Sequence, residues 1–331
     1  MSPQPGDQLA VVSQTGCSVT LVDAVDHTVR RVLGVPAEPH ELCFDAEHRV
    51  VYCSVPYVGG QYGAHHGHDS RVVVLDPDAG EIVDVLDLAP ENGPHGLALD
   101  PVRRLLYVSV EAGPAGPGGA VVVDTTTRTV LRRIDTLAPG PHWFAVDPAG
   151  RHGYAANKEA PFVTAVDLVT GEVVDTITVP GSEGIAVHPG GGPVAVAGPH
   201  HEGDGAPGVR LVDPASHDIV ATLPTRDRTV PVHWTSRGVL LAGEMRPDDP
   251  VGRLSVWADV DASAVGVEVG QGPLTITSSP DGDRAYVAAV FGGTVTVVDL
   301  ADPTRPVALD TLDVRGPGVQ GAHGLAYVPA P

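Results

Sequence analysis

One recurring phrase of seven residues limits the fold of this 331-residue chain more than any other feature. Its closest copies begin with Pro-His and end with Asp, and they read PHELCFD, PHGLALD and PHWFAVD from positions 39, 94 and 141. A related phrase begins at Ala322, and weaker copies begin at Ser182, Pro231 and Pro273. In four copies a tyrosine follows the second position by twelve residues: His40 to Tyr52, His95 to Tyr107, His142 to Tyr154 and Leu274 to Tyr286. Internal similarity of this regularity indicates a repeat architecture.

Each unit contains four short apolar runs separated by turns. The phrase itself is the first run, a second follows a tight turn, a third ends in Asp after a variable loop, and a fourth follows another turn. Seven units average about 47 residues, which is typical of four-stranded propeller blades. We therefore predict an all-β, seven-bladed β-propeller, with residues 1–331 as a single domain and residues 1–7 flexible. The run at 8–14 resembles a second strand and the run at 323–328 a first strand, so the two ends should pair and close the ring.

Composition excludes several kinds of partner. The chain has 41 acidic and 20 basic residues, a formal charge of −21, and its basic residues are scattered. No positive track exists to neutralise phosphates, so nucleic acid and anionic membranes are not expected partners. The start is polar and no stretch of about 18 apolar residues occurs, which predicts a cytoplasmic protein. Three cysteines without metal-site spacing predict buried free thiols, and a closed ring predicts a monomer.

Two sequence patterns resemble known families. The stretch SPDGDRAYVA from Ser279, together with RLLYVS from Arg104, resembles the YVTN-type repeat of bacterial seven-bladed propellers over essentially the whole chain. The Pro-His-Gly-Leu phrase is similar to the blade openings of streptogramin B lyase, in which histidines and a magnesium ion serve catalysis. That likeness falls on His95, and less closely on His40, His142 and His323. The resemblance implies a propeller fold and metal-assisted lyase chemistry.

The repeat places four histidines at equivalent positions around the channel. His323, His40, His95 and His142 begin the first strands of four successive blades, and Glu183 holds the same place in the fifth. In the sixth blade either Val232 or His233 takes this position, and in the seventh Leu274 does. First strands line the channel of a propeller, so four imidazoles and a carboxylate should converge from different blades. This donor set favours a transition metal, copper or iron before zinc. The alternative is a set of polar residues that line a wet channel, copied by duplication.

A second histidine cluster lies in the long connection between the second and third runs of the second unit. It contains His65, His66 and His68, which we expect to form a lid over the channel, to supply further ligands or to move protons. The matching connection of the fifth unit contains His200 and His201, for which incidental metal affinity is the simpler interpretation. We assign no role to His233.

Three functions remain open. The leading hypothesis is a metal-dependent oxidoreductase or oxygenase that acts on a small organic molecule, with Glu183 as a ligand or orienting group. A histidine ring at the mouth of a seven-bladed propeller is similar in architecture to the ferrous site of carotenoid-cleaving oxygenases and to the copper-rich ring of nitrous oxide reductase. The second hypothesis is a metal-assisted lyase or hydrolase, similar to streptogramin lyase or to a lactonase. The third is a non-catalytic binding or scaffold propeller.

Overall fold

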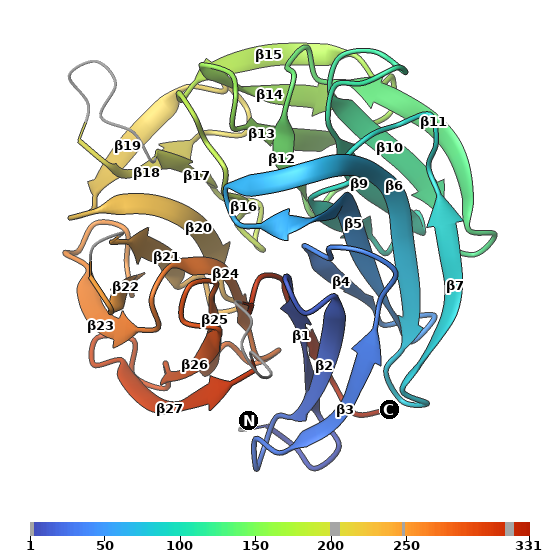
Figure 1. The fold of residues 1–331 in the computed structure, drawn as a ribbon. Coiled ribbons are helices and arrows are strands. Elements are labelled where there is room, and N and C mark those ends of the chain that lie inside the picture. The colour runs from blue at the N-terminus through green and yellow to red at the C-terminus, as the bar shows by residue number, and fades with distance from the viewer. Residues whose placement is uncertain (1–2, 199–205, 247–248, 315–320) are drawn as a thin grey trace.

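The computed structural model describes residues 3–198, 206–246, 249–314 and 321–331, and every regular element in these residues is a β-strand. The strands form seven antiparallel sheets of four strands. Figure 1 shows these sheets arranged as blades around a central axis. The predicted all-β, seven-bladed propeller is therefore confirmed. No helix that could cross a membrane occurs in the described residues.

The blades follow one another along the chain, with four strands in each. The first blade contains β28 (Leu325–Val328), β1 (Gln8–Ser13), β2 (Ser18–Asp23) and β3 (Val29–Gly34). The second contains β4 (Leu42–Asp45), β5 (Val50–Gln61), β6 (Ala64–Asp76) and β7 (Glu81–Asp87). The third contains β8 (Leu97–Asp100), β9 (Leu105–Val110), β10 (Gly119–Asp124) and β11 (Thr129–Asp135). The fourth contains β12 (Pro141–Val146), β13 (His152–Asn157), β14 (Phe162–Asp167) and β15 (Val173–Thr178). The fifth contains β16 (Ile185–Val187), β17 (Val194–Gly198), β18 (Gly208–Val212) and β19 (Ile219–Pro224). The sixth contains β20 (Arg228–Trp234), β21 (Leu240–Met245), β22 (Gly252–Trp257) and β23 (Val265–Val269). The seventh contains β24 (Pro273–Ser278), β25 (Arg284–Ala289), β26 (Thr294–Asp299) and β27 (Val307–Asp313).

The two ends of the chain complete one blade, as the sequence predicted. Strand β28 pairs antiparallel with β1, in a register that places Gln8 opposite Val328 and Val11 opposite Leu325. Asp7 strengthens this junction because its carboxylate accepts hydrogen bonds from the Tyr327 hydroxyl at 2.5 Å and the Ala330 amide at 2.8 Å. The pairing covers the open edge that β1 would otherwise expose.

The hydrophobic core lies between neighbouring blades. Middle strands are apolar at almost every position because both of their faces are buried, as the pattern LLYVSV of β9 illustrates. Outer strands are mostly exposed, as the burial pattern of β27 shows, in which one residue of seven is buried. One interblade cluster joins Leu9 and Val11 of β1 to Val295 and Val297 of β26. Burial of apolar surface, at about 25 cal/mol per Å², thus holds each blade against the next.

Glycines allow the innermost strands to approach closely. A Cβ atom on Gly96 would lie 2.6 Å from the carbonyl oxygen of His142, and one on Gly324 would lie 2.3 Å from that of His40. The amide of Gly96 instead donates a hydrogen bond to the His142 carbonyl at 2.8 Å. The Ser109 hydroxyl of β9 donates to the same oxygen at 2.7 Å. Where glycine follows the histidine of the repeated phrase, at Gly96 and Gly324, it therefore allows this close spacing between adjacent inner strands.

Candidate metal centre

The four inner-strand histidines lie next to one another in the channel. Their ring centroids are separated by 4.3 Å between His323 and His40, 4.7 Å between His40 and His95, and 4.2 Å between His95 and His142. His40, His95 and His323 are buried, and His142 is partly buried. The repeat thus brings together four residues that come from four blades. They form a row of neighbouring rings, and carboxylates join this row at two places.

The first carboxylate is Glu38, which lies two residues before His40. Its Oε1 atom is 3.2 Å from His40 Nε2 and 2.8 Å from His65 Nδ1. The Gln14 side chain, at the end of β1, donates a hydrogen bond to the same oxygen at 2.6 Å, and its amide nitrogen is 3.0 Å from His40 Nε2. Glu38 is therefore the centre of a buried group that combines residues from the first and second blades.

The second carboxylate is Glu111, which follows β9. Its Oε1 atom lies 3.5 Å from His95 Nε2 and accepts a hydrogen bond of 2.5 Å from the Tyr57 hydroxyl. Its Oε2 atom lies 3.4 Å from Nδ1 of the exposed His68. The Tyr57 ring also stacks on His65, with centroids 4.1 Å apart. Tyr57 consequently connects the surroundings of Glu111 with those of Glu38.

Among the residues that the structure describes, two sets of three residues could each hold a metal ion. One consists of Glu38, His40 and His65, and the other of His95, Glu111 and His142. Within each set, one potential ligand atom from every residue lies within 4.8 Å of the others. Each set supplies two imidazoles and one carboxylate, a combination that binds iron(II) and catalytic zinc in proteins. The sequence predicted one centre with four imidazoles, whereas the structure groups the donors as two neighbouring sets.

The protonation of these residues suits metal binding. Burial places the pKa of His40 and of His142 well below the ordinary value, and the neighbouring imidazoles act in the same direction. Burial also lowers the pKa of His95, although Glu111 opposes this effect. For Glu111 itself, burial acts to raise the pKa, but hydrogen bonds from His95 and Tyr57 outweigh it and leave the pKa below its usual value. Neutral imidazoles and an ionised carboxylate are the forms that bind metals.

Several polar atoms of the centre are buried without a hydrogen-bond partner among the described residues. They include His40 Nδ1 and Glu38 Oε2. His323 Nδ1 lies 3.1 Å from Glu41 Oε1 but has no hydrogen-bond partner among the described residues. Unsatisfied buried atoms cost free energy, and an ion or ordered water would offset that cost. The donor set therefore fits a metal ion.

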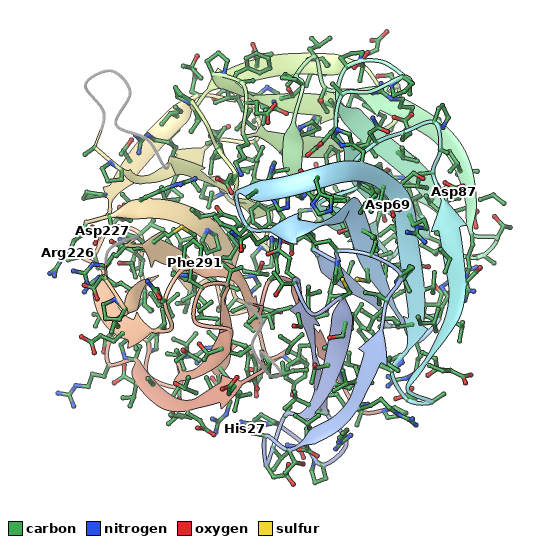
Figure 2. All side chains as sticks on the ribbon, in the orientation of Figure 1. His27, Asp69, Asp87, Arg226, Asp227 and Phe291 are labelled. Atoms are coloured by element: carbon green, nitrogen blue, oxygen red, sulfur yellow. The ribbon has the colours of Figure 1, made fainter. Side chains whose placement is uncertain are left out.

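The connection that contains His65, His66 and His68 is a β-hairpin and not an irregular loop. Strands β5 and β6 continue past the edge of their blade and pair as far as Gln61 and Ala64. Figure 1 shows this extension reaching over the middle of the ring. At its tip Tyr62 contacts the ring of Phe291 from the seventh blade, at 5.6 Å between centroids. Phe291 lies beside the channel in Figure 2. The hairpin thus crosses the channel, and a role as a lid stays a prediction.

Other predicted site residues lie outside the two sets. His66 is exposed and lies opposite Gly59 in the hairpin. Glu183 is buried, but its carboxylate contacts Arg228 at 2.7 Å and Lys158 at 3.6 Å and no imidazole of the centre. His200 and His201 lie outside the described residues.

The sixth blade differs from the prediction. A Cβ on Gly184 would lie 2.1 Å from the Val230 carbonyl oxygen, the same relation that Gly96 has to His142. Val230 thus holds the channel position, and it packs with Leu274 in an apolar cluster. Neither Val232 nor His233 takes that place.

Sequence reasoning missed three polar residues of the centre, Gln14, Glu38 and Glu41. The run Glu-Pro-His-Glu at 38–41, with an acidic residue on both sides of the histidine, was the signal that could have found two of them.

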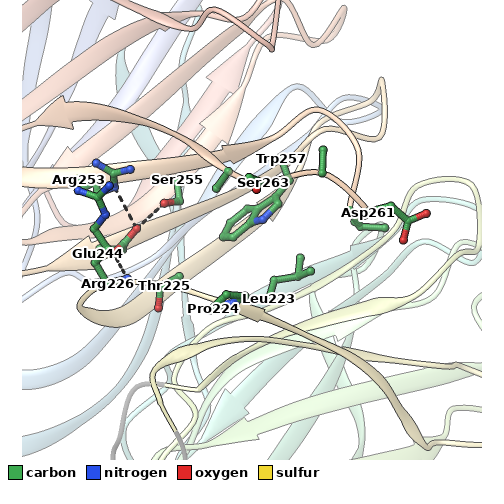
Figure 3. A pocket seen from close by; sticks show the side chains of 13 residues that line it. Leu223, Pro224, Thr225, Arg226, Glu244, Arg253, Ser255, Trp257, Asp261 and Ser263 are labelled. Atoms are coloured by element: carbon green, nitrogen blue, oxygen red, sulfur yellow. Dashed lines mark hydrogen bonds and ion pairs between the residues drawn. The ribbon is translucent and has the colours of Figure 1, made fainter.

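Another cavity, of about 380 Å³, lies between the fifth and sixth blades (Figure 3). Glu244, at its wall, is fully buried, and its carboxylate accepts hydrogen bonds from the backbone amides of Arg226 and Asp227 at 2.8 and 3.0 Å. It also accepts a hydrogen bond from the Ser255 hydroxyl, and Arg253 Nε lies 3.4 Å away. These partners occupy the carboxylate, so Glu244 stabilises the wall.

His233 gives a prediction about the pH dependence of stability. Burial lowers its pKa from 6.5 to about 4, and its Nε2 lies 2.9 Å from the Ser278 hydroxyl. Between these two values the unfolded chain binds a proton that the folded chain does not, so stability is full above pH 6.5 and falls as the pH drops toward 4. We expect this residue to contribute about 1–3 kcal/mol to that fall. Urea denaturation of a His233→Gln variant, which can still bond to Ser278, should show a shallower decline. An identical decline in the two proteins would contradict the prediction.

Comparison with known proteins supports the fold. No protein-family model matches the chain. Uncharacterized YncE proteins from Salmonella typhi and Salmonella typhimurium are each 26% identical to it over 196 residues, which cover 57% of this chain and 49% of the relatives. The chain thus spans about half the length of the curated relatives it matches. The resemblances to the YVTN-type repeat and to streptogramin B lyase stay predictions.

Two solved structures have a similar fold. A chain of hydrazine synthase from Kuenenia stuttgartiensis aligns with a TM-score of 0.69 at 20% identity and covers 86% of this chain and 90% of its own length. A functionally unknown protein from Desulfotomaculum acetoxidans aligns with a TM-score of 0.72 at 9% identity, over 98% of this chain and 99% of its own. At these identities the likeness shows the fold alone.

Proposed function

We propose that this protein binds transition metal ions in the channel and uses them to transform a small organic molecule, as an oxidoreductase or oxygenase. The proposal depends on one observation, the two adjacent sets of residues. Each set has two imidazoles and one carboxylate, and its members are buried or partly buried. Iron or copper in such a centre would supply electron transfer or activation of oxygen. The choice of metal follows from the donor set, because nitrogen-rich sites with one carboxylate suit iron better than magnesium or calcium.

The residues of the chain have separate roles in this proposal. Glu38, His40 and His65 would hold one ion, and His95, Glu111 and His142 the other. Tyr57 positions Glu111 through its hydroxyl and His65 through its ring. Burial and the neighbouring Glu111 raise the pKa of Tyr57, so its hydroxyl remains a hydrogen-bond donor at neutral pH.

His68 and His323 each lie next to a member of one of the two sets. His68 is exposed and lies 3.4 Å from Glu111, so it is placed to carry protons between this carboxylate and solvent. His323 is buried beside His40, and Glu41, which contacts Thr275, lies next to it. His323 would either bind a metal as a further ligand or fix the orientation of His40.

A second candidate function is metal-assisted lyase or hydrolase chemistry. Two imidazoles and one carboxylate also bind catalytic zinc, which acts as a Lewis acid without redox change. The observed sets, each with a carboxylate, fit this candidate better than the centre of four histidines that the sequence predicted. A scaffold propeller without metal is the third possibility, and metal content separates it from both enzymes.

Metal content is the direct test. We expect untagged protein, reconstituted anaerobically with iron(II), copper or zinc, to retain one to two equivalents after desalting. Chelation should then lower the unfolding temperature, because a ligand that binds the folded state stabilises it. Oxygen consumption that requires iron or copper would support the oxidoreductase, and turnover of ester or lactone substrates with zinc alone would support the second candidate. Only trace metal and no response to chelation would refute both.

A further inference from the structure

A single lysine occupies the channel beside the metal centre. Of the 20 basic residues of the chain, Lys158 is the only lysine and the other 19 are arginines. Lys158 follows β13, and its ammonium nitrogen lies 3.6 Å from Glu183 Oε1 and 5.5 Å from the centroid of the Tyr62 ring. A separation of 3.6 Å is too long for a hydrogen bond, so the ammonium is attracted to Glu183 only by charge. Its N–H groups can therefore donate hydrogen bonds to another acceptor.

Arg228 approaches the same carboxylate from the start of β20. One terminal nitrogen of its guanidinium donates a hydrogen bond to Glu183 Oε1 at 2.7 Å. Its Nε atom is buried and has no hydrogen-bond partner among the described residues. A guanidinium has five N–H groups arranged to grip an oxyanion, and this one uses few of them.

The charges at this place do not cancel. Two cations meet one carboxylate, since the other described partner of Glu183 is the neutral Tyr62 hydroxyl at 3.4 Å. The side chain of Glu183 is 1% exposed, whereas those of Lys158 and Arg228 are each 32% exposed. The buried carboxylate therefore holds two cations whose outer sides remain accessible, and one positive charge is left over.

This cationic pair is close to the second metal set. Lys158 follows Asn157, which pairs with Pro141 next to His142, and its backbone amide donates a hydrogen bond to the Gly140 carbonyl at 3.1 Å. Tyr62, which covers Lys158, also contacts the ring of His323 at 6.5 Å between centroids. An anion bound between Lys158 and Arg228 would thus lie beside the proposed metal ligands.

We propose that Lys158 and Arg228 form an oxyanion subsite next to the metal centre, held in place by Glu183. The substrate is then a small anion whose carboxylate or phosphate group binds these two cations. The assignment of the anion as substrate rests on the proposed function, but the subsite itself does not.

Anion binding tests the subsite directly. Metal-free and zinc-loaded protein would be titrated with oxalate and with inorganic phosphate in a calorimeter. We expect at least one anion to bind, and Arg228→Gln or Lys158→Gln to weaken it by about 10-fold or more, as loss of a hydrogen bond to a charged group does. Arg226→Gln is the matched control, because Figure 2 shows Arg226 at the outer rim of the ring. This variant should bind the anion as tightly as the wild type. Preference for oxalate or phosphate identifies the chemical group.

The unique lysine provides a second readout that does not need metal. An amine-reactive acylating reagent should modify Lys158, and the bound anion should slow this modification, as followed by peptide mass spectrometry. Absence of anion binding, or equal binding by wild type and both variants, overturns the subsite. Anion binding without any metal binding overturns the proposed function and leaves the subsite in place.

Discussion

Protein in which His142 is replaced by alanine is expected to lose tight metal binding at one of the two sets. His142 belongs to the set with His95 and Glu111, so two of the three ligands remain there. Loss of a directly bound imidazole should weaken affinity by at least about 100-fold, since even the outer partners of ligands contribute 10–100-fold. Equilibrium dialysis with zinc or cobalt(II) should therefore show about one equivalent fewer than in the wild type. His65→Ala should do the same for the other set.

The control for these variants is a histidine far from the channel. His27 lies at the outer rim in Figure 2, and its Nδ1 contacts Asp310 at 2.7 Å. Its backbone has a φ of 62°, so asparagine is the substitution that this conformation tolerates. His27→Asn should retain the full metal content. If His142→Ala and His65→Ala retain it as well, the two sets are not the metal sites.

Substitution of Gly184 by alanine is expected to destabilise the ring strongly. The added methyl group would lie 2.1 Å from the carbonyl oxygen of Val230, which is backbone and cannot rotate away. The inner strands of the fifth and sixth blades would have to separate, at a cost of about 1–3 kcal/mol. Urea denaturation should show this loss as a lower midpoint.

Gly34 offers the comparison for this variant. It ends the outer strand β3, and a Cβ atom there would meet nothing within 4 Å. Gly34→Ala should leave stability unchanged or raise it slightly. Equal midpoints for the two alanine variants would mean that close approach of the inner strands does not require glycine.

The fold was predictable because its information is local and repeated. Each copy of the phrase with its turn, followed in four copies by a tyrosine twelve residues after the second position, specifies one blade, and seven copies specify the ring. The same repetition predicted the neighbourhood of His40, His95, His142 and His323, since equivalent positions on inner strands must surround one axis.

The rest of the centre was less predictable because it depends on residues outside the repeat. Glu38 and Gln14 are not repeated in residue type at the equivalent positions of the other blades, and only the three-dimensional contact between the first two blades joins them. The ordered pairing of the long hairpin was hidden by its glycines, which are typical of loops. Glu183 holds the equivalent position, but Arg228 and Lys158, which the repeat does not encode, occupy its carboxylate.

The pairing of β28 with β1 has a consequence for synthesis on the ribosome. Strand β1 ends at Ser13, and its partner begins at Leu325, so about 310 residues are translated between them. At about 5–20 residues per second, the nascent β1 edge waits roughly 15–60 s for its partner. His323 emerges just before that partner, so the neighbourhood of His40 is completed only after this interval. Metal binding at the proposed centre is therefore expected to follow the synthesis of β28.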